Sequence, residues 1–290
     1  MLTSARISKT CRVILIALAS SAVASADTLT LVTTPASQSA NDSVKWSQLG
    51  TNLKTLGSKV IAKSGRGISL TAGLSGANSV TAVVCSASPC SWTHGTNFTA
   101  GHTLLWTSNA ANGGNGPLSL TFATPVAGAG AFVQADEPGR FTAKIQVFNG
   151  STSLGTFTVI SDANGDATYI GVLDQTGANI NRVVFSLAGC GSGDVNCPLA
   201  DFAIDTINLN VTVLPLSVTL AGTGTGSVTS SPAGIVCPTT CTRNFPLGSA
   251  VTLTAKPSSG STFVGWSGAC SGTTACSVTM STAKSVTATF

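Results

Sequence analysis

The segment Phe141-Thr-Ala-Lys-Ile-Gln-Val-Phe148 decides the fold, because apolar and polar residues alternate in it from Phe141 to Val147. Such alternation predicts a β-strand with one buried face and one solvated face. Asn149-Gly150 follows at once, and the strand pattern resumes from Leu154 to Ile160. We therefore expect a β-hairpin closed by a tight Asn-Gly turn.

The same strand character extends outward from this hairpin in both directions. A second Asn-Gly pair, Asn164-Gly165, precedes a strand-like run at 167–172, and a hairpin turn is expected there too. Residues 43–56 are compatible with a short helix. Further strands are expected at 80–85, 103–107, 117–123, 129–134, 182–187 and 201–210. Many short strands separated by Gly and Asn predict an all-β protein, with an antiparallel sandwich of jelly-roll type as its larger part.

The N-terminal 26 residues have the pattern of a secretory signal peptide. Three positive charges precede the apolar run 13–19, and Ala24-Ser25-Ala26 offers the small residues of a cleavage site. A membrane anchor is the alternative, but the run falls well short of the roughly 20 residues that span a bilayer. We expect a secreted protein, extracellular or at the cell surface, without a membrane span in the mature chain.

Charge is sparse and nearly balanced in the expected mature protein. Only 8% of the 290 residues are charged, and three of the 14 Lys and Arg residues lie in the leader. The rest of the chain has 11 basic residues against 10 Asp and Glu. This composition offers no basic stripe for phosphates, so a nucleic-acid partner is not expected.

The cysteines are an even set once the leader and its Cys11 are removed. Eight cysteines in an oxidising compartment predict disulfides, and their close spacing favours four local bridges. The alternative is a zinc site built from the last two pairs, although no His lies near them in the sequence. The four expected pairs are Cys85/Cys90, Cys190/Cys197, Cys237/Cys241 and Cys270/Cys276.

The charge balance changes near Val213-Leu-Pro-Leu216, where Pro215 is expected to interrupt a strand. Residues 27–214 carry eight basic and ten acidic side chains, whereas residues 215–290 carry three basic side chains and no acid. We therefore expect two domains, 27–214 and 215–290. A unit as small as the second has a marginal core, so two disulfides would stabilise it.

Residues 217–290 resemble the divergent InlB B-repeat family of bacterial surface proteins. The resemblance rests on Ser217 to Val228, Ser231-Pro-Ala-Gly-Ile-Val-Cys237, Val251-Thr-Leu-Thr-Ala255, Phe263-Val-Gly-Trp-Ser-Gly-Ala-Cys270 and Lys284-Ser-Val-Thr-Ala-Thr-Phe290. It implies a small β-grasp-like module that serves as a spacer or appendage on secreted proteins and brings no catalytic residues. Trp266 is expected to fill its core, with ligand binding as the alternative.

Residues 117–210 resemble the β-sandwich domains of secreted bacterial proteins that often end in a PEP-CTERM sorting signal. The similar stretches are 125–131, 141–157, 169–173 and 201–207. The sorting helix itself is not expected, since the sequence lacks its pattern. Such sandwiches are similar in outline to galactose-binding-like carbohydrate modules, and the resemblance implies sugar binding by analogy of fold.

A glycan site would need exposed aromatic rings. Trp92, with His94 in the polar loop Ser91-Trp-Thr-His-Gly95, is the expected ligand-binding residue, whereas Trp46 and Trp106 are expected to pack in the core.

Calcium is the one cofactor that the sequence suggests. Asp201 and Asp205 lie two strand periods apart and would point to the same side, where a calcium ion or loop amides could balance their charge. Asp162-Ala-Asn-Gly-Asp166 resembles the start of a calcium loop but lacks its later Gly and its closing Glu, which favours a turn with solvated aspartates.

The sequence offers few candidate catalytic residues. The chain has two histidines, His94 and His102, one glutamate, Glu137, and no Gly-x-Ser-x-Gly motif. A paired-carboxylate site would have to combine Asp136 or Glu137 with Asp201 or Asp205. We therefore expect a non-enzymatic binding or adhesion protein that recognises a glycan or a cell-surface protein. A secreted hydrolase with its site in the sandwich loops and a structural matrix protein are the alternatives.

Overall fold

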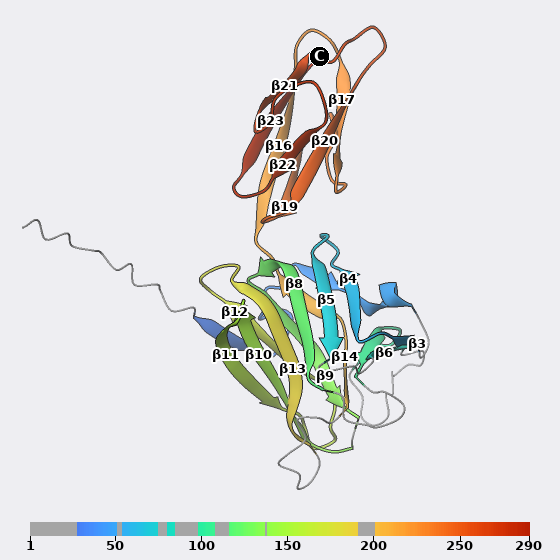
Figure 1. Ribbon diagram of the computed structural model, residues 1–290, viewed down its shortest axis with the longest axis vertical. Coiled ribbons are helices and arrows are strands. Elements are labelled where there is room, and N and C mark those ends of the chain that lie inside the picture. The colour runs from blue at the N-terminus through green and yellow to red at the C-terminus, as the bar shows by residue number, and fades with distance from the viewer. Residues whose placement is uncertain are drawn as a thin grey trace, which may run out of the picture.

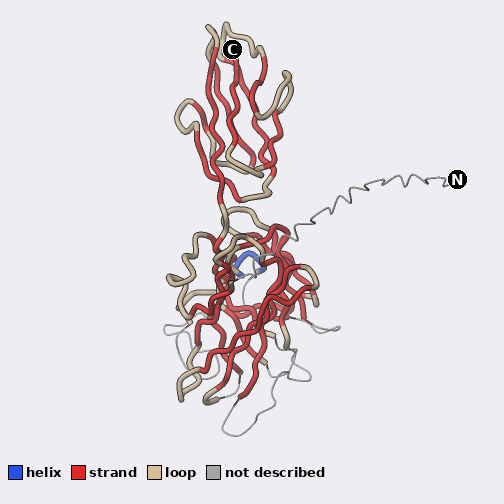
Figure 2. The backbone as a smooth tube through the Cα atoms, turned by 90° about the vertical axis from the view of Figure 1, so that its left-hand side faces the viewer, coloured by secondary structure: helices blue, strands red, loops and turns tan. Residues whose placement is uncertain are grey.

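The computed structural model describes residues 28–50, 54–74, 80–84, 98–107, 116–136, 138–190 and 201–290. These residues form strands and one 3-10 turn, η1 (Trp46–Leu49), so the all-β class is confirmed. The helix expected over 43–56 is limited to this turn. Within the described ranges, no helix has the length and apolar character needed to cross a bilayer. Figures 1 and 2 show a larger unit, the sandwich (28–212), and a smaller unit, the module (213–290), at one end of it.

The sandwich consists of two antiparallel sheets, in agreement with the sequence. In spatial order, the nine-stranded sheet contains β1 (Leu29–Val32), β12 (Thr168–Asp174), β9 (Gly128–Ala135), β14 (Phe202–Ile204), β7 (Thr103–Trp106), β6 (Val80–Val84) and β3 (Lys54–Leu56), and β15 (Ile207–Asn210) pairs with β9 and β2 (Asp42–Val44). The six-stranded sheet contains β11 (Thr152–Ile160), β10 (Phe141–Asn149), β13 (Ile180–Cys190), β8 (Leu118–Val126), β5 (Ser69–Leu74) and β4 (Lys59–Lys63).

The β10–β11 hairpin forms as its alternation predicts. Phe141, Ala143, Ile145 and Val147 of β10 are at most 1% exposed, whereas the polar residues between them are half-buried. Ile145 stands opposite Phe157 on β11. The second Asn-Gly turn is different, because it leads from β11 in the six-stranded sheet to β12 in the nine-stranded sheet. A hairpin at Asn164-Gly165 is therefore wrong: the turn carries the chain across the sandwich.

The sandwich core lies between the two sheets, but β9 is buried on both faces. Gln38, from the 33–41 loop, covers the outer face of β9 and is fully buried. A Cβ on Gly130 would lie 2.5 Å from Gln38 Oε1, so only glycine allows this approach. The amide also accepts a hydrogen bond from the Tyr169 hydroxyl at 2.6 Å and donates one to the Asn208 carbonyl at 2.7 Å.

The module is an all-β unit built from two four-stranded sheets around its own core. One sheet contains β19 (Thr242–Pro246), β16 (Val213–Ala221), β23 (Lys284–Thr289) and β21 (Gly265–Gly268), and the other contains β18 (Val236–Cys237), β17 (Gly226–Ser231), β20 (Ala250–Pro257) and β22 (Cys276–Thr279). The form differs from a β-grasp, in which a sheet packs on a helix, because two sheets enclose the core. Two disulfides, Cys237–Cys241 and Cys270–Cys276, close short loops as expected.

A single strand, β16, joins the two units. Val211 is buried in the sandwich core, and Val213 packs against that core while it pairs with Pro246 of β19. The intervening Thr212 accepts a hydrogen bond from the Leu247 amide at 2.8 Å. The interruption expected at Pro215 does not occur. Pairing with β23 begins only at the next residue, so the missing N–H of Pro215 is tolerated.

Candidate functional site

The predicted glycan-binding residues Trp92 and His94 lie outside the described residues. So do Cys85, Cys90 and Cys197, and only the backbone of Cys190 is described, at the end of β13 opposite Phe141. The glycan contact at this loop and the two disulfides of the sandwich therefore stay predictions.

Asp205 is hydrogen-bonded to a histidine. Its side chain is 4% exposed, and both carboxylate oxygens lie 2.9 Å from His102 Nδ1. The carboxylate also accepts the backbone N–H of Thr206 at 2.5 Å, while the Asp205 carbonyl accepts the indole N–H of Trp46 at 2.9 Å. An unbroken strand over 201–210 is therefore wrong. The chain turns at Asp205–Thr206, between β14 and β15, where the side chain binds the backbone locally.

Few further groups that could bind a calcium ion lie beside Asp201 and Asp205 in the described part of the chain. Asp201 is half-buried, and its carbonyl accepts the Asp136 N–H at 3.0 Å. In the described ranges, His, Cys, Asp and Glu side chains form no group of three or more that could hold a metal. Calcium binding stays a prediction.

The Asp162–Asp166 segment is a turn closed by a hydrogen bond to the side chain of its first residue. Asp162 Oδ1 accepts the Asp166 backbone N–H at 2.8 Å. That hydrogen bond stabilises the carboxylate and holds the pKa of Asp162 below its ordinary value.

Two tryptophans are buried as expected, and a third is half-buried. Trp46 is 1% exposed. Trp106 packs against a small apolar cluster, around Phe98, on the nine-stranded sheet. Trp266 is 5% exposed in the module core and donates its indole N–H to the Thr274 carbonyl at 2.6 Å. These contacts account for core roles at Trp46 and Trp266.

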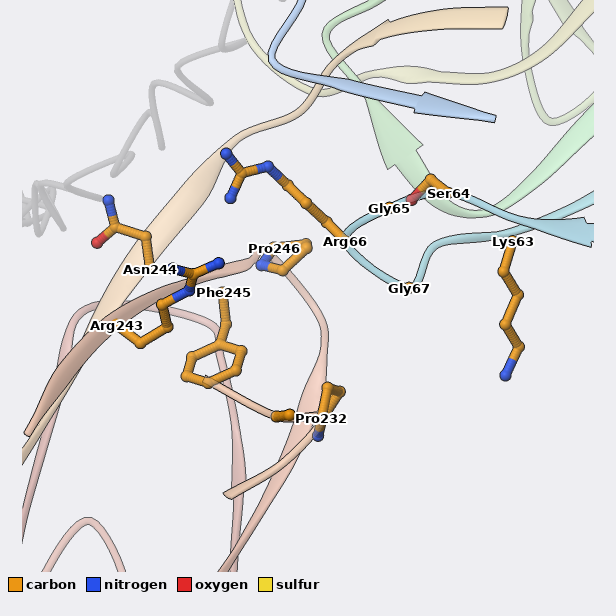
Figure 3. Close-up of a pocket in the computed structure, with 11 residues that line it drawn as sticks. Lys63, Ser64, Gly65, Arg66, Gly67, Pro232, Arg243, Asn244, Phe245 and Pro246 are labelled. Atoms are coloured by element: carbon orange, nitrogen blue, oxygen red, sulfur yellow. The ribbon is translucent and has the colours of Figure 1, made fainter. Parts of the chain in front are cut away.

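A cleft of about 300 Å³ lies where the sandwich meets the module. Figure 3 shows the β4–β5 turn of the sandwich facing β19 of the module, with Arg66 extending toward the strand that carries Arg243 and Asn244. The cleft is lined by Lys63, Ser64, Gly65, Arg66, Gly67, Pro232, Ala233, Arg243, Asn244, Phe245 and Pro246.

Hydrogen bonds hold the sandwich side of this cleft in one conformation. Ser64 exchanges two backbone hydrogen bonds with neighbours in the turn, from its N–H to the Ile68 carbonyl at 2.9 Å and from the Gly67 N–H to its own carbonyl at 2.9 Å. Asp42 lies behind the turn, where its Oδ1 accepts the Arg66 backbone N–H at 3.1 Å. The Arg66 Nε–H donates to the Asn41 carbonyl at 3.0 Å, which fixes the base of its guanidinium group.

The module side of the cleft is fixed by close packing. Arg243 lies on β19, paired with Leu216 of β16, and its aliphatic stem crosses Gly234 in the β17–β18 loop. A Cβ on Gly234 would lie 2.8 Å from Arg243 Cγ, so a glycine is needed for this contact. Ser230 Oγ holds the same loop by donating to the Pro232 carbonyl at 2.8 Å.

The lining is basic. It includes Lys63, Arg66 and Arg243 and contains neither Asp nor Glu. Within the described part of the chain, none of these three cations has a carboxylate within ion-pair distance. The arrangement can therefore attract and hold a negatively charged group.

The interpretation of the sequence did not include this cleft. One signal was present, because residues 215–290 carry basic side chains and no acid. The missing information was spatial: nothing local in the sequence shows that the β4–β5 turn faces β19.

Comparison with protein families finds a match for the module. Residues 216–290 match the divergent InlB B-repeat domain, which agrees with the resemblance of this segment to modules of bacterial surface proteins. Comparison with curated proteins found no match to the chain. The two disulfides of the module fit an extracellular location.

Proposed function

We propose that the protein is a secreted, non-catalytic binding or adhesion protein that recognises a glycan or another surface molecule. The module would display or space the sandwich at the cell surface. The family match of residues 216–290 and the two disulfides support this location.

The observation that carries the proposal is the cleft shared by the two units. A ligand held there would contact the sandwich and the module at once, and interfaces between domains are a common place for ligand sites. Because β16 passes directly from one core to the other, the junction has no loose linker. The sandwich wall and the module wall of the cleft are thus held next to each other.

A glycan-array screen of the full, oxidised chain tests the proposal. We expect binding that is lost in Asn244→Phe, because a ring at this exposed position would fill the cleft. Thr254→Phe is the matched control, since Thr254 is exposed on β20 and does not line the cleft. Loss in Trp92→Ala, with binding kept in Asn244→Phe, would move the site to the Trp92 loop. Absence of any glycan ligand would contradict the proposal.

The same screen in EDTA tests calcium. If a calcium ion supports the site, EDTA lowers binding and added calcium restores it. Binding that is equal under both conditions would count against calcium.

The His102–Asp205 pair favours a second candidate function, a secreted hydrolase. A buried carboxylate that binds Nδ1 orients an imidazole for acid–base work at its other nitrogen, and His102 is 38% exposed. Screening the chain against glycoside and ester substrates tests this function. It requires turnover that His102→Ala abolishes without unfolding the protein.

A further inference from the structure

We infer that the cleft between the sandwich and the module is an anion-binding site, and that it takes a carboxylate or sulfate group carried on an acidic polysaccharide. The inference rests on the proposed function and deepens it by naming the ligand class. It is carried by three observations: the charge of the lining, the way its arginines are held, and the apolar surface beside them.

The first observation is the positive charge of the cleft lining. Lys63 and Arg66 line the cleft from the sandwich, and Arg243 lines it from the module. Figure 3 shows the guanidinium groups of the two arginines on the same side, with Lys63 pointing away from them. Only 8% of the residues of the chain are charged, so two arginines and a lysine that line one cleft without an acidic side chain make it locally positive. The carboxylate that contacts the turn, Asp42, is engaged behind it by the backbone N–H groups of Ser43 and Arg66.

The second observation is that each arginine contacts its own unit through atoms other than its terminal nitrogens. The Arg66 Nε–H is bound to the Asn41 carbonyl, and the donors on the two terminal nitrogens are left for a ligand. The stem of the exposed Arg243 passes close over Gly234. A guanidinium group with a fixed position can bind a carboxylate or a sulfate through two parallel hydrogen bonds, and little side-chain freedom is lost on binding.

The third observation is the apolar surface next to the cations. Phe245, Pro232 and Pro246 line the same cleft, and Asn244 adds a polar amide. A sugar acid combines an oxyanion with an apolar ring face and hydroxyl groups, and this lining offers a partner for each. The volume of about 300 Å³ lies at the lower end of the range for small-molecule sites, which suits one or two sugar units.

Four polymers serve as probes for the charge requirement: three polysaccharides, and polyglutamate as an acidic peptide. Sodium polygalacturonate supplies carboxylates, dextran sulfate supplies sulfates, and unmodified dextran supplies neither. Binding of the full chain to each is measured by isothermal titration calorimetry at low and at physiological salt. We expect binding to polygalacturonate, to dextran sulfate or to both, weaker at the higher salt, and none to dextran. Binding to one charged polymer alone identifies the oxyanion.

The variants then assign the site. Arg66→Gln and Arg243→Gln are each expected to lower the affinity by about tenfold, because each removes charge-assisted hydrogen bonds. The matched controls are Lys144→Gln in the sandwich and Lys256→Gln in the module, which remove the same charge outside the cleft and should leave the affinity within about twofold. Arg66→Lys keeps the charge but loses the Nε–H, and is expected to lie between the wild type and Arg66→Gln. Thermal unfolding of every variant checks that the fold is kept.

Several results would overturn the inference. The first is that the protein binds neither charged polysaccharide. The second is that the control variants lose as much affinity as the arginine variants. The third is that polyglutamate binds as tightly as the charged polysaccharides through the same two arginines, which would point to an acidic peptide as the ligand. If the wild type and both arginine variants bind neutral glycans on the array equally well, the inference is wrong, whereas the proposed function is supported. Failure of every glycan and every charged polymer would contradict both.

Discussion

The side chain of Arg243 lies across Gly234, with its Cγ 2.8 Å from the position that a Cβ on Gly234 would occupy. The two residues belong to β19 and to the β17–β18 loop of the module. The contact places a cation at the wall of the cleft that faces the sandwich, and it depends on the absence of a side chain at residue 234.

Gly234→Ala tests this contact without altering any charge. The added methyl group would displace the stem of Arg243, so we expect weaker binding of the charged polysaccharide that the wild type binds, by several-fold. Gly260→Ala is the control, because Gly260 also has a positive φ, as Gly234 does, and its Cβ would meet no atom within 4 Å. Calorimetric titration of both variants measures the effect. An unchanged affinity in Gly234→Ala would show that the position of Arg243 does not matter.

Tyr169→Phe is expected to destabilise the sandwich by about 1–3 kcal/mol. The variant leaves Gln38 Oε1 buried without the 2.6 Å hydrogen bond from the tyrosine hydroxyl. Urea unfolding of the two proteins measures the difference in the free energy of unfolding. A difference below about 0.5 kcal/mol would mean that another donor replaces the hydroxyl.

The same tyrosine predicts a loss of stability in alkali. Burial raises the pKa of Tyr169 above its ordinary value of about 10. The unfolded state thus loses the phenolic proton more readily than the folded state, and the stability contribution is full below pH ~10 and falls as the pH rises above it. Tyr169 is the only tyrosine in the chain, so the ultraviolet absorbance of tyrosinate reports its ionisation. Ionisation well before unfolding would contradict the prediction, and Tyr169→Phe should lack this part of the pH dependence.

His102→Ala is expected to lower the free energy of unfolding by about 1–2 kcal/mol, because it removes a partner from the buried Asp205 carboxylate. Asp205 keeps its hydrogen bonds from Thr206, which limits the loss. In a double-mutant cycle, His102→Ala combined with Asp205→Asn should cost less than the sum of the single variants. Additive costs, measured by urea unfolding, would show that the two side chains do not interact.

Each disulfide of the module should stabilise it by about 2 kcal/mol, since each closes a short loop. Replacing Cys237 and Cys241 together by Ala, and separately Cys270 and Cys276, tests the two bridges. The chain has three further tryptophans, so the nuclear magnetic resonance signal of the Trp266 indole N–H, rather than total fluorescence, follows unfolding of the module. Variants as stable as the wild type would assign the module's stability to its core alone.

The sequence predicts best where a structure depends on neighbouring residues. The alternation in β10 is local and forms as expected. A tight turn follows it, but Asn149 pairs with Thr152, so the two central residues of the turn are Gly150 and Ser151 rather than Asn149 and Gly150. Burial of both faces of β9 was not predictable in this way, because it depends on Gln38, far away in the chain. The Asn164-Gly165 turn has the residues of a hairpin, but its strands pair with different partners.

The candidate site shows the same division. Asp205 could be singled out from the sequence as an aspartate facing the core, but its partner His102 lies about a hundred residues away, so the sequence could not show their hydrogen bond. Arg66 and Arg243 are farther apart still, and they line one cleft because β16 links the two cores directly.

The most direct test of the shared cleft is a nuclear magnetic resonance titration of the full chain with an acidic oligosaccharide, such as a galacturonate oligomer or its sulfated counterpart. The account predicts that the backbone amides of Gly65 and Gly67 in the sandwich and of Ala233 and Asn244 in the module shift together, with one dissociation constant. Shifts confined to one unit, or no shifts at these four residues, would contradict it.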